Sequence, residues 1–167
     1  MKIGIANDHR GYNLKNELVK YLKSRGYEVI DYGSDTVYSV DYPDFAFKLC
    51  NGVVNKEVDF GIAICGSGIG ISIACNKVNG IRCAKLSNVK EAYATRFDND
   101  ANVMAINGDM PRYRAKDIVD KFLSTDFSNL EKHVRRIKKI EDYEDGKYNE
   151  CYIFYIYNSF GYSYLGF

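Results

Sequence analysis

Short apolar runs alternate along the chain with segments in which apolar residues recur every three or four positions. The runs are at 2–6, 28–32, 59–64, 81–86 and 103–106, and each has the length and composition of a buried strand. A helical period follows the first run, where Leu14, Leu18 and Leu22 precede Gly26. Strands that alternate with helices predict a Rossmann-like three-layer α/β/α fold around a five-stranded parallel sheet.

The end of the chain departs from this pattern. A last, C-terminal helix is predicted over about 130–140, and the residues after it are charged and then rich in Tyr, Phe and Ile. The stretch 151–157 has neither charge nor proline, which is the composition of an added strand. We therefore predict one domain over 1–142 and an atypical Tyr/Phe-rich C-terminal extension over 143–167. A hairpin on the body, an idiosyncratic extension and a functional tail all remain open for it.

Charge and cysteine usage narrow the classes of partner and ligand. Lys and Arg number 23 against 22 for Asp and Glu, which gives no reason to expect nucleic acid or an acidic membrane as partner. No stretch approaches the roughly 18 apolar residues of a membrane-spanning helix, and the first residues lead directly into a strand. The 5 cysteines form no C-x-x-C pair and only 2 histidines are present, so we expect neither a disulfide framework nor a zinc site. A cytoplasmic location is the corresponding expectation.

The residues that follow the predicted strands include many side chains that can react or form hydrogen bonds. They are Asn7 to Gly11, Ser39 to Pro43, Cys65 to Gly70, Ser87 with Asn88, and Asn107 with Gly108. Ligands of open parallel sheets bind beyond the carboxyl ends of the strands. A carboxylate, an imidazole, a phenol, a thiol and a hydroxyl are thus expected at one edge of the sheet.

Cys65 lies where an apolar run ends and a glycine-spaced turn begins. Gly66, Gly68 and Gly70 allow a tight turn whose N–H groups point into one concavity, which favours a phosphate or a developing enolate oxygen. Ser67 could relay a proton there. Cysteine is also among the most frequently buried residue types. The residues alone therefore leave open whether Cys65 is a reactive group or a small core residue.

Four blocks of the sequence resemble the ribose-5-phosphate isomerase B family, which includes the subunits of galactose-6-phosphate isomerase. These blocks are NDHRGYNLK, VDYPD, ICGSGIGISIACNKVNGIR and NDANV. The resemblance covers about 1–140 and leaves out the tail. It implies a cofactor-free aldose–ketose isomerase of phosphorylated sugars, a homodimer or dimer of dimers whose active sites lie at the interface between chains.

The resemblance also implies roles for individual residues. Cys65 corresponds to the base that moves a proton between C1 and C2 of the sugar, and Ser67 to the hydroxyl that assists it. The amides of Gly66, Gly68, Ile69 and Gly70 match the hole that holds the enediolate. Asp8 and His9 match a polar pair that handles the sugar ring and phosphate, and Tyr42 and Asn99 match sugar-contacting positions.

A basic segment and two departures complete the comparison with the family pattern. Lys132 and Arg136, four residues apart in EKHVRRIKK, match the positions that bind the substrate phosphate, and we expect them to reach the partner's site. Lys132 stands where arginine is usual, which replaces a forked donor by a point charge. Asp98 stands where the family has the histidine that opens the sugar ring. Asp98 could replace that histidine or be a surface carboxylate, and Asp8 or His9 could open the ring instead.

The predicted function is the interconversion of ribose 5-phosphate and ribulose 5-phosphate through a cis-enediolate, as in the pentose phosphate pathway. One alternative is an isomerase of a six-carbon sugar phosphate, such as allose 6-phosphate or galactose 6-phosphate, or of free rare sugars. Another is a sugar-phosphate-binding protein without catalysis. A receiver-like signalling module fits less well, because Asp8 is isolated and a cysteine ends the third strand.

Overall fold

The sheet of this computed structural model is fully parallel, and the structure describes residues 1–148. Within those residues five strands lie in the order β2-β1-β3-β5-β4. They are β1 (Lys2–Asn7), β2 (Glu28–Asp31), β3 (Phe60–Cys65), β4 (Cys83–Lys85) and β5 (Val103–Asn107). Because every neighbouring pair is parallel, the five carboxyl ends lie at the same edge. The predicted five-stranded parallel sheet is confirmed.

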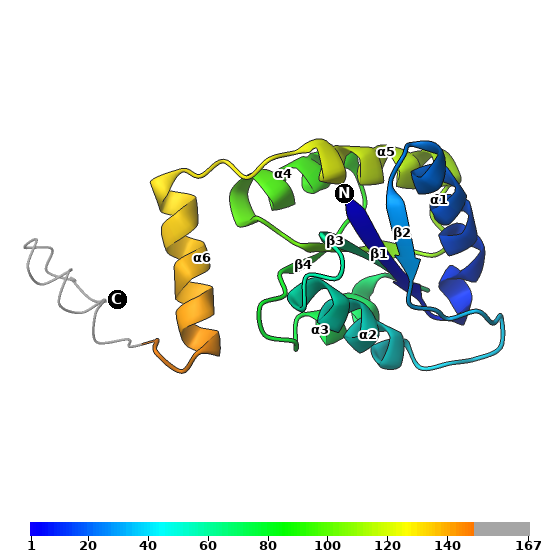
Figure 1. The fold of residues 1–167 in the computed structure, drawn as a ribbon, viewed down its shortest axis with the longest axis horizontal. Coiled ribbons are helices and arrows are strands. Elements are labelled where there is room, and N and C mark those ends of the chain that lie inside the picture. The colour runs from blue at the N-terminus through cyan, green and yellow to red at the C-terminus, as the bar shows by residue number, and fades with distance from the viewer. Residues whose placement is uncertain (149–167) are drawn as a thin grey trace, which may run out of the picture.

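Helices cover both faces of the sheet, as the alternation predicts. One face carries α1 (Tyr12–Ser24), α4 (Val89–Asn99) and α5 (Arg112–Ser124), and the other carries α2 (Tyr42–Val54) and α3 (Ile69–Cys75). A single 3-10 turn, η1 (His9–Gly11), joins β1 to α1. The last described helix, α6 (Glu131–Glu144), stands at the end of the molecule, beyond β4 and next to α4 (Figure 1).

The core divides into two apolar clusters because successive strand residues point to opposite faces. Ile3, Ile62 and Phe122 belong to the cluster under α1, α4 and α5. Ala63 and Cys65 belong to the cluster under α2 and α3. The strands are apolar on both faces for this reason, and the side chain of Cys65 lies on the α2/α3 side.

Strand β4 is shorter than the apolar run that predicts it. It covers only Cys83–Lys85 of the run 81–86, and helix α3 ends at Cys75. The amide side chain of Asn76, the residue after α3, bonds to both backbone groups of Cys83, the first residue of β4: its Nδ2 donates to the Cys83 carbonyl at 2.8 Å and its Oδ1 accepts from the Cys83 N–H at 2.8 Å. Side-chain bonds of this kind compete with regular structure.

A buried lysine fixes the loop that leads from β2 toward α2. Lys15 is 1% exposed, and its Nζ lies 2.8 Å from Asp31 Oδ2, 2.9 Å from Asp35 Oδ1 and 3.0 Å from the Ser34 carbonyl oxygen. We expect Lys15→Met to lower the free energy of unfolding by about 2–3 kcal/mol, because the carboxylates and the carbonyl lose a shared donor. Urea denaturation measures the change. Lys20→Met, on the exposed face of the same helix, is the matched control, and an equal loss there would contradict the assignment.

Candidate active site

The thiol of Cys65 lies at the carboxyl end of β3, enclosed by the turn that follows it. Its exposed fraction is 4%, and its Sγ accepts a hydrogen bond from the Gly68 N–H at 3.2 Å. The Cys65 carbonyl accepts from Gly108 N at 2.9 Å, which joins this turn to the one after β5. The turn thus aims a backbone donor at the sulfur, the type of donor that stabilises a charged acceptor.

Gly68 is the residue that allows this arrangement. Its φ of +76° is left-handed, and a Cβ built there would lie 2.9 Å from the Ile106 carbonyl carbon. Ile69 N, the next amide, bonds to Ser67 Oγ at 3.1 Å, so Ser67 fixes the turn and is exposed two residues after Cys65. Two of the amides predicted to face a ligand are therefore engaged locally, with Sγ and Oγ as their acceptors.

We expect Gly68→Ala to damage both stability and activity. The left-handed conformation costs a non-glycine residue about 1–2 kcal/mol, and the contact with Ile106 adds strain that shifts the Gly68 amide away from Cys65. Thermal denaturation measures the effect on stability. An assay of the sugar-phosphate isomerisation expected from the sequence measures the effect on activity. Gly26→Ala is the matched control, since Gly26 has a φ of +85° and an added Cβ there would have nothing within 4 Å. Equal activity in the two variants would contradict the role given to the Gly68 amide.

The loop after β1 supplies Asp8 and His9 to the same edge. Asp8 is 6% exposed, and its Oδ1 accepts from Arg10 N at 2.8 Å and from Gly11 N at 3.1 Å, so this oxygen caps the 3-10 turn. His9 Nδ1 accepts from Val40 N at 3.3 Å. In the neutral ring this leaves the hydrogen on Nε2, which is then free to donate to a ligand.

Tyr42, the first residue of α2, reaches across to the turn after β3. Its side chain covers Gly70, where a Cβ would lie 2.8 Å from the Tyr42 Cζ atom. Tyr42 is 37% exposed, so the phenol is still open to solvent. The structure therefore gathers Asp8, His9, Tyr42 and the turn at 65–70 around one edge, as expected for residues that follow parallel strands.

Arg10 belongs to this edge although no motif in the sequence assigns it a role. Its side chain lies over Gly66, where a Cβ would be 2.8 Å from Arg10 Cδ, and its Nη2 pairs with Asp109 Oδ2 at 2.8 Å. Asn107 pairs in register with Cys65 and holds Asp109 through its own side chain, with Oδ1 2.6 Å from Asp109 N. The only sequence signal that could have placed Arg10 and Asn107 at the site is that each belongs to a segment that follows a predicted strand.

Asp98 and Asn99 lie at the opposite edge of the sheet. They end α4, and four residues later β5 starts at Val103, which pairs with Gly61, whereas Cys65 pairs with Asn107 at the other end. Four strand steps separate the two edges by about 13 Å. A single chain therefore does not bring Asp98 or Asn99 to its own Cys65.

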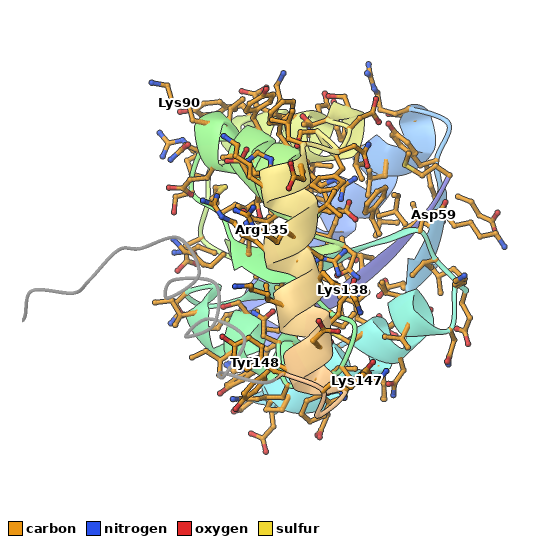
Figure 2. All side chains as sticks on the ribbon, turned by 90° about the vertical axis from the view of Figure 1, so that its left-hand side faces the viewer. Asp59, Lys90, Arg135, Lys138, Lys147 and Tyr148 are labelled. Carbon is orange, nitrogen blue, oxygen red and sulfur yellow. The ribbon has the colours of Figure 1, made fainter. Side chains whose placement is uncertain are left out.

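The exposed cations Lys132 and Arg136 are also remote from Cys65 along the fold. Both lie on α6, which contacts α4 more than any other element. Figure 2 looks onto this helix, with Arg135 and Lys138 labelled on it. In residues 1–148 neither Lys132 nor Arg136 has an acidic group within ion-pair distance, while Arg135 lies 3.8 Å from Glu131 and Lys138 lies 2.7 Å from Asp142.

An open pocket of about 420 Å³ lies between the last turns of α6 and the body. Asn99 lines it, together with Asn76, Ile81, Arg82, Cys83, Ala84, Thr95, Ala101, Ile140 and Glu144. Cys65 does not. Asn99 thus faces a hollow at the α6 end of the molecule, and not the edge that carries the thiol.

The other described cysteines lie away from the site. Cys50 and Cys75 are fully buried between α2 and α3, where they act as small core residues, and Cys83 is half-buried in β4. Hydrogen bonding with Cys75, together with burial, raises the pKa of the Cys50 thiol far above its usual value. Among the cysteines of residues 1–148, Cys65 is the one at the carboxyl edge.

The described residues offer neither a metal centre nor a membrane span. Over residues 1–148 no cluster of three or more His, Cys, Asp or Glu side chains is arranged to hold a metal ion. None of the described helices has the length and apolar character to cross a membrane. The predicted extension falls mainly on 149–167, outside the described residues.

Known proteins resemble this chain over nearly all of the described part. Residues 3–140 match the family described as Ribose/Galactose Isomerase. Ribose-5-phosphate isomerase B of Escherichia coli is 41% identical over 140 residues, covering 83% of this chain and 93% of that protein.

Solved structures agree with the sequence match. Ribose-5-phosphate isomerase B of Clostridium thermocellum has a TM-score of 0.85 and 49% identity, covering 87% of this chain and 99% of that one. The corresponding enzyme of Thermotoga maritima has a TM-score of 0.82 and 43% identity, with coverages of 84% and 97%. The shared fold, with the thiol, imidazole and phenol at its carboxyl edge, agrees with the family match. The chain therefore belongs to the ribose/galactose isomerase family, and it is an isomerase.

Proposed function

We propose that the protein interconverts ribose 5-phosphate and ribulose 5-phosphate, with Cys65 as the base. The observation that carries the proposal is the Cys65 thiol at the carboxyl edge, whose Sγ lies 3.2 Å from the Gly68 N–H in the turn that also carries Ser67. Relatives named ribose-5-phosphate isomerase B support the choice of substrate.

The reaction needs a base and donors, and the turn after β3 offers both. The Cys65 thiolate takes the proton from C2 of the open-chain aldose and returns it to C1, passing through a cis-enediolate. The amides of Gly66 to Gly70 stabilise the enediolate oxygens, for which the Gly68 and Ile69 N–H groups exchange their local acceptors for substrate. Ser67 assists proton movement between O1 and O2. Asp8, His9 and Tyr42 orient the sugar.

The active site is completed by a second copy of the chain. Asp98, Asn99, Lys132 and Arg136 lie on elements that cannot reach the Cys65 edge of their own chain. In a homodimer the α4 and α6 end of one subunit meets the carboxyl edge of the other, so that Lys132 and Arg136 bind the substrate phosphate and Asn99 contacts the sugar.

Exposed apolar residues mark surfaces that such a dimer would cover. Ile69 and Ile73 on α3 are 55% and 56% exposed, and Val134 and Ile140 on α6 are 46% and 49% exposed. Burying them would supply part of the association energy. A dimer of dimers could use the remaining faces. The described cysteines are free thiols, which supports a cytoplasmic location.

A comparison of substrates tests the proposal. We expect higher kcat/KM for ribose 5-phosphate than for allose 6-phosphate or tagatose 6-phosphate, assayed side by side with a chelator present. A preference for a six-carbon phosphate would favour the alternative of an isomerase that acts on six-carbon sugar phosphates. Saturable binding without exchange of the substrate C2 proton with solvent would instead indicate a binding protein without catalysis.

A further inference from the structure

His133 is a buried titratable group to which the proposed reaction gives no role. It lies on α6 and is 5% exposed, although both neighbours along the helix, Lys132 and Val134, are exposed. Its ring packs edge-on against Phe97 of α4, with centroids 6.4 Å apart and an interplanar angle of 76°. Buried polar groups keep hydrogen-bond partners, so each ring nitrogen should have one.

Both nitrogens do face a partner. Nδ1 lies 2.7 Å from Ser128 Oγ, and Nε2 lies 3.6 Å from Asp98 Oδ1. A carboxylate only accepts, so the tautomer that can donate to Asp98 carries the hydrogen on Nε2, and its Nδ1 then accepts from the Ser128 hydroxyl. Ser128 is itself fixed: its Oγ accepts from Leu130 N at 3.3 Å and its N–H donates to the Phe97 carbonyl at 3.0 Å. The chain of donors therefore runs from Ser128 through His133 to Asp98.

Asp98 can interact with His133 through one carboxylate oxygen while the other stays accessible. Its side chain is 48% exposed, and within residues 1–148 its Oδ2 has no hydrogen-bond or ion-pair partner. One carboxylate oxygen thus faces a buried imidazole while the other is open to solvent. The 3.6 Å separation is longer than a hydrogen bond, and catalytic hydrogen bonds often tighten only when substrate is bound.

We propose that His133 positions Asp98 as the proton carrier that opens the sugar ring, an inference that rests on the proposed function. Asp98 Oδ2 accepts the O1 proton of the furanose, O1 forms the carbonyl with C1, and the C1–O4 bond breaks with its electron pair going to O4. Asp98 then gives the same proton to O4, so the carboxylate ends as it began. His133 Nε2–H holds Oδ1 throughout and fixes the direction in which Oδ2 points.

The two substrates of the reaction separate ring opening from enolisation. Ribulose 5-phosphate has no stable ring, because its C5 oxygen carries the phosphate and closure through O4 would give a four-membered ring. Uptake of solvent deuterium at C1 of ribulose 5-phosphate therefore requires the Cys65 chemistry but not ring opening. Isomerisation of ribose 5-phosphate requires both.

We expect His133→Gln to lower kcat/KM for ribose 5-phosphate by about 10–100-fold and to leave deuterium uptake into ribulose 5-phosphate within about 3-fold of the parent. Ser128→Ala should produce the same split with a smaller loss. A purely structural role, in which His133 only docks α6 on α4, predicts that both rates fall together, and that result would overturn the proposal.

Asp98→His provides a second, independent readout. An imidazole at position 98 carries its own proton and does not need the support of His133. We expect His133→Gln to cost less than about 3-fold on ribose 5-phosphate in the Asp98→His background, against about 10–100-fold in the parent. Equal losses in the two backgrounds would overturn the pairing of His133 with Asp98. A parent enzyme with neither isomerisation nor deuterium uptake would overturn the proposed function itself, a result that no variant of His133 produces on its own.

Discussion

Cys65→Ala is expected to lower isomerisation of ribose 5-phosphate by about 10³-fold or more, because the substitution removes the proposed base. The same variant should lose deuterium exchange at C1 of ribulose 5-phosphate. The fold should persist, since alanine fits the space of the thiol and the turn at 66–68 loses only the bond from Gly68 N to Sγ. Circular dichroism and the urea midpoint check that the variant is folded.

Cys50→Ala is the matched control for this experiment. Cys50 is also a fully buried thiol in the α2/α3 cluster, but it lies in the middle of α2, away from the carboxyl edge. We expect Cys50→Ala to cost about 1–2 kcal/mol of stability and to keep its activity within about 2-fold, because no group of the site is changed. Activity of Cys65→Ala within a few-fold of the parent would show that another group is the base.

The sheet could be predicted from the sequence because its signals are local. The run 59–64 is apolar at nearly every position, which a strand requires only when helices cover both faces, and Gly68 marks the start of the next helix. Because all strands are parallel, Asp8, Tyr42 and Cys65 then fall at one edge. This placement does not depend on the strand order, which the sequence left open.

Contacts between distant elements could not be predicted in this way. Asp98 and Cys65 lie at opposite edges because α4 runs antiparallel to the strands, so that its last residues return to the amino ends. The contact between Asp98 and His133 depends on the path of α6 across α4, for which the segment EKHVRRIKK carries no signal. The capping bond from Asp8 Oδ1 to Arg10 N likewise depends on a 3-10 turn of only three residues.

Asp98, Lys132 and Arg136 lie apart from Cys65 of the same chain. The proposal that two chains share each active site can therefore be tested directly. Lys132→Ala/Arg136→Ala removes both cations that are proposed to bind the phosphate, and we expect it to lower kcat/KM by about 10²–10⁴-fold, since hydrogen bonds to charged groups contribute about 1.5–3 kcal/mol each. Arg135→Ala/Lys139→Ala, with the same spacing and charge on the same helix, is the matched control and should change kcat/KM less than about 3-fold. Equal losses in the two double variants would indicate that only the charge of α6 matters.

Hybrid dimers then decide whether the two halves of the site come from different chains. Cys65→Ala chains and Lys132→Ala/Arg136→Ala chains are co-expressed with two different tags, and the hybrid is isolated over both. A shared site predicts one intact and one doubly defective site per hybrid, hence about half of the parental activity at low substrate concentration, although each parent variant alone is nearly inactive. Sites built within one chain would instead leave one defect in each site. A hybrid no more active than the mean of its two parent variants would therefore place Lys132, Arg136 and Cys65 in the same subunit's site and contradict the homodimeric arrangement.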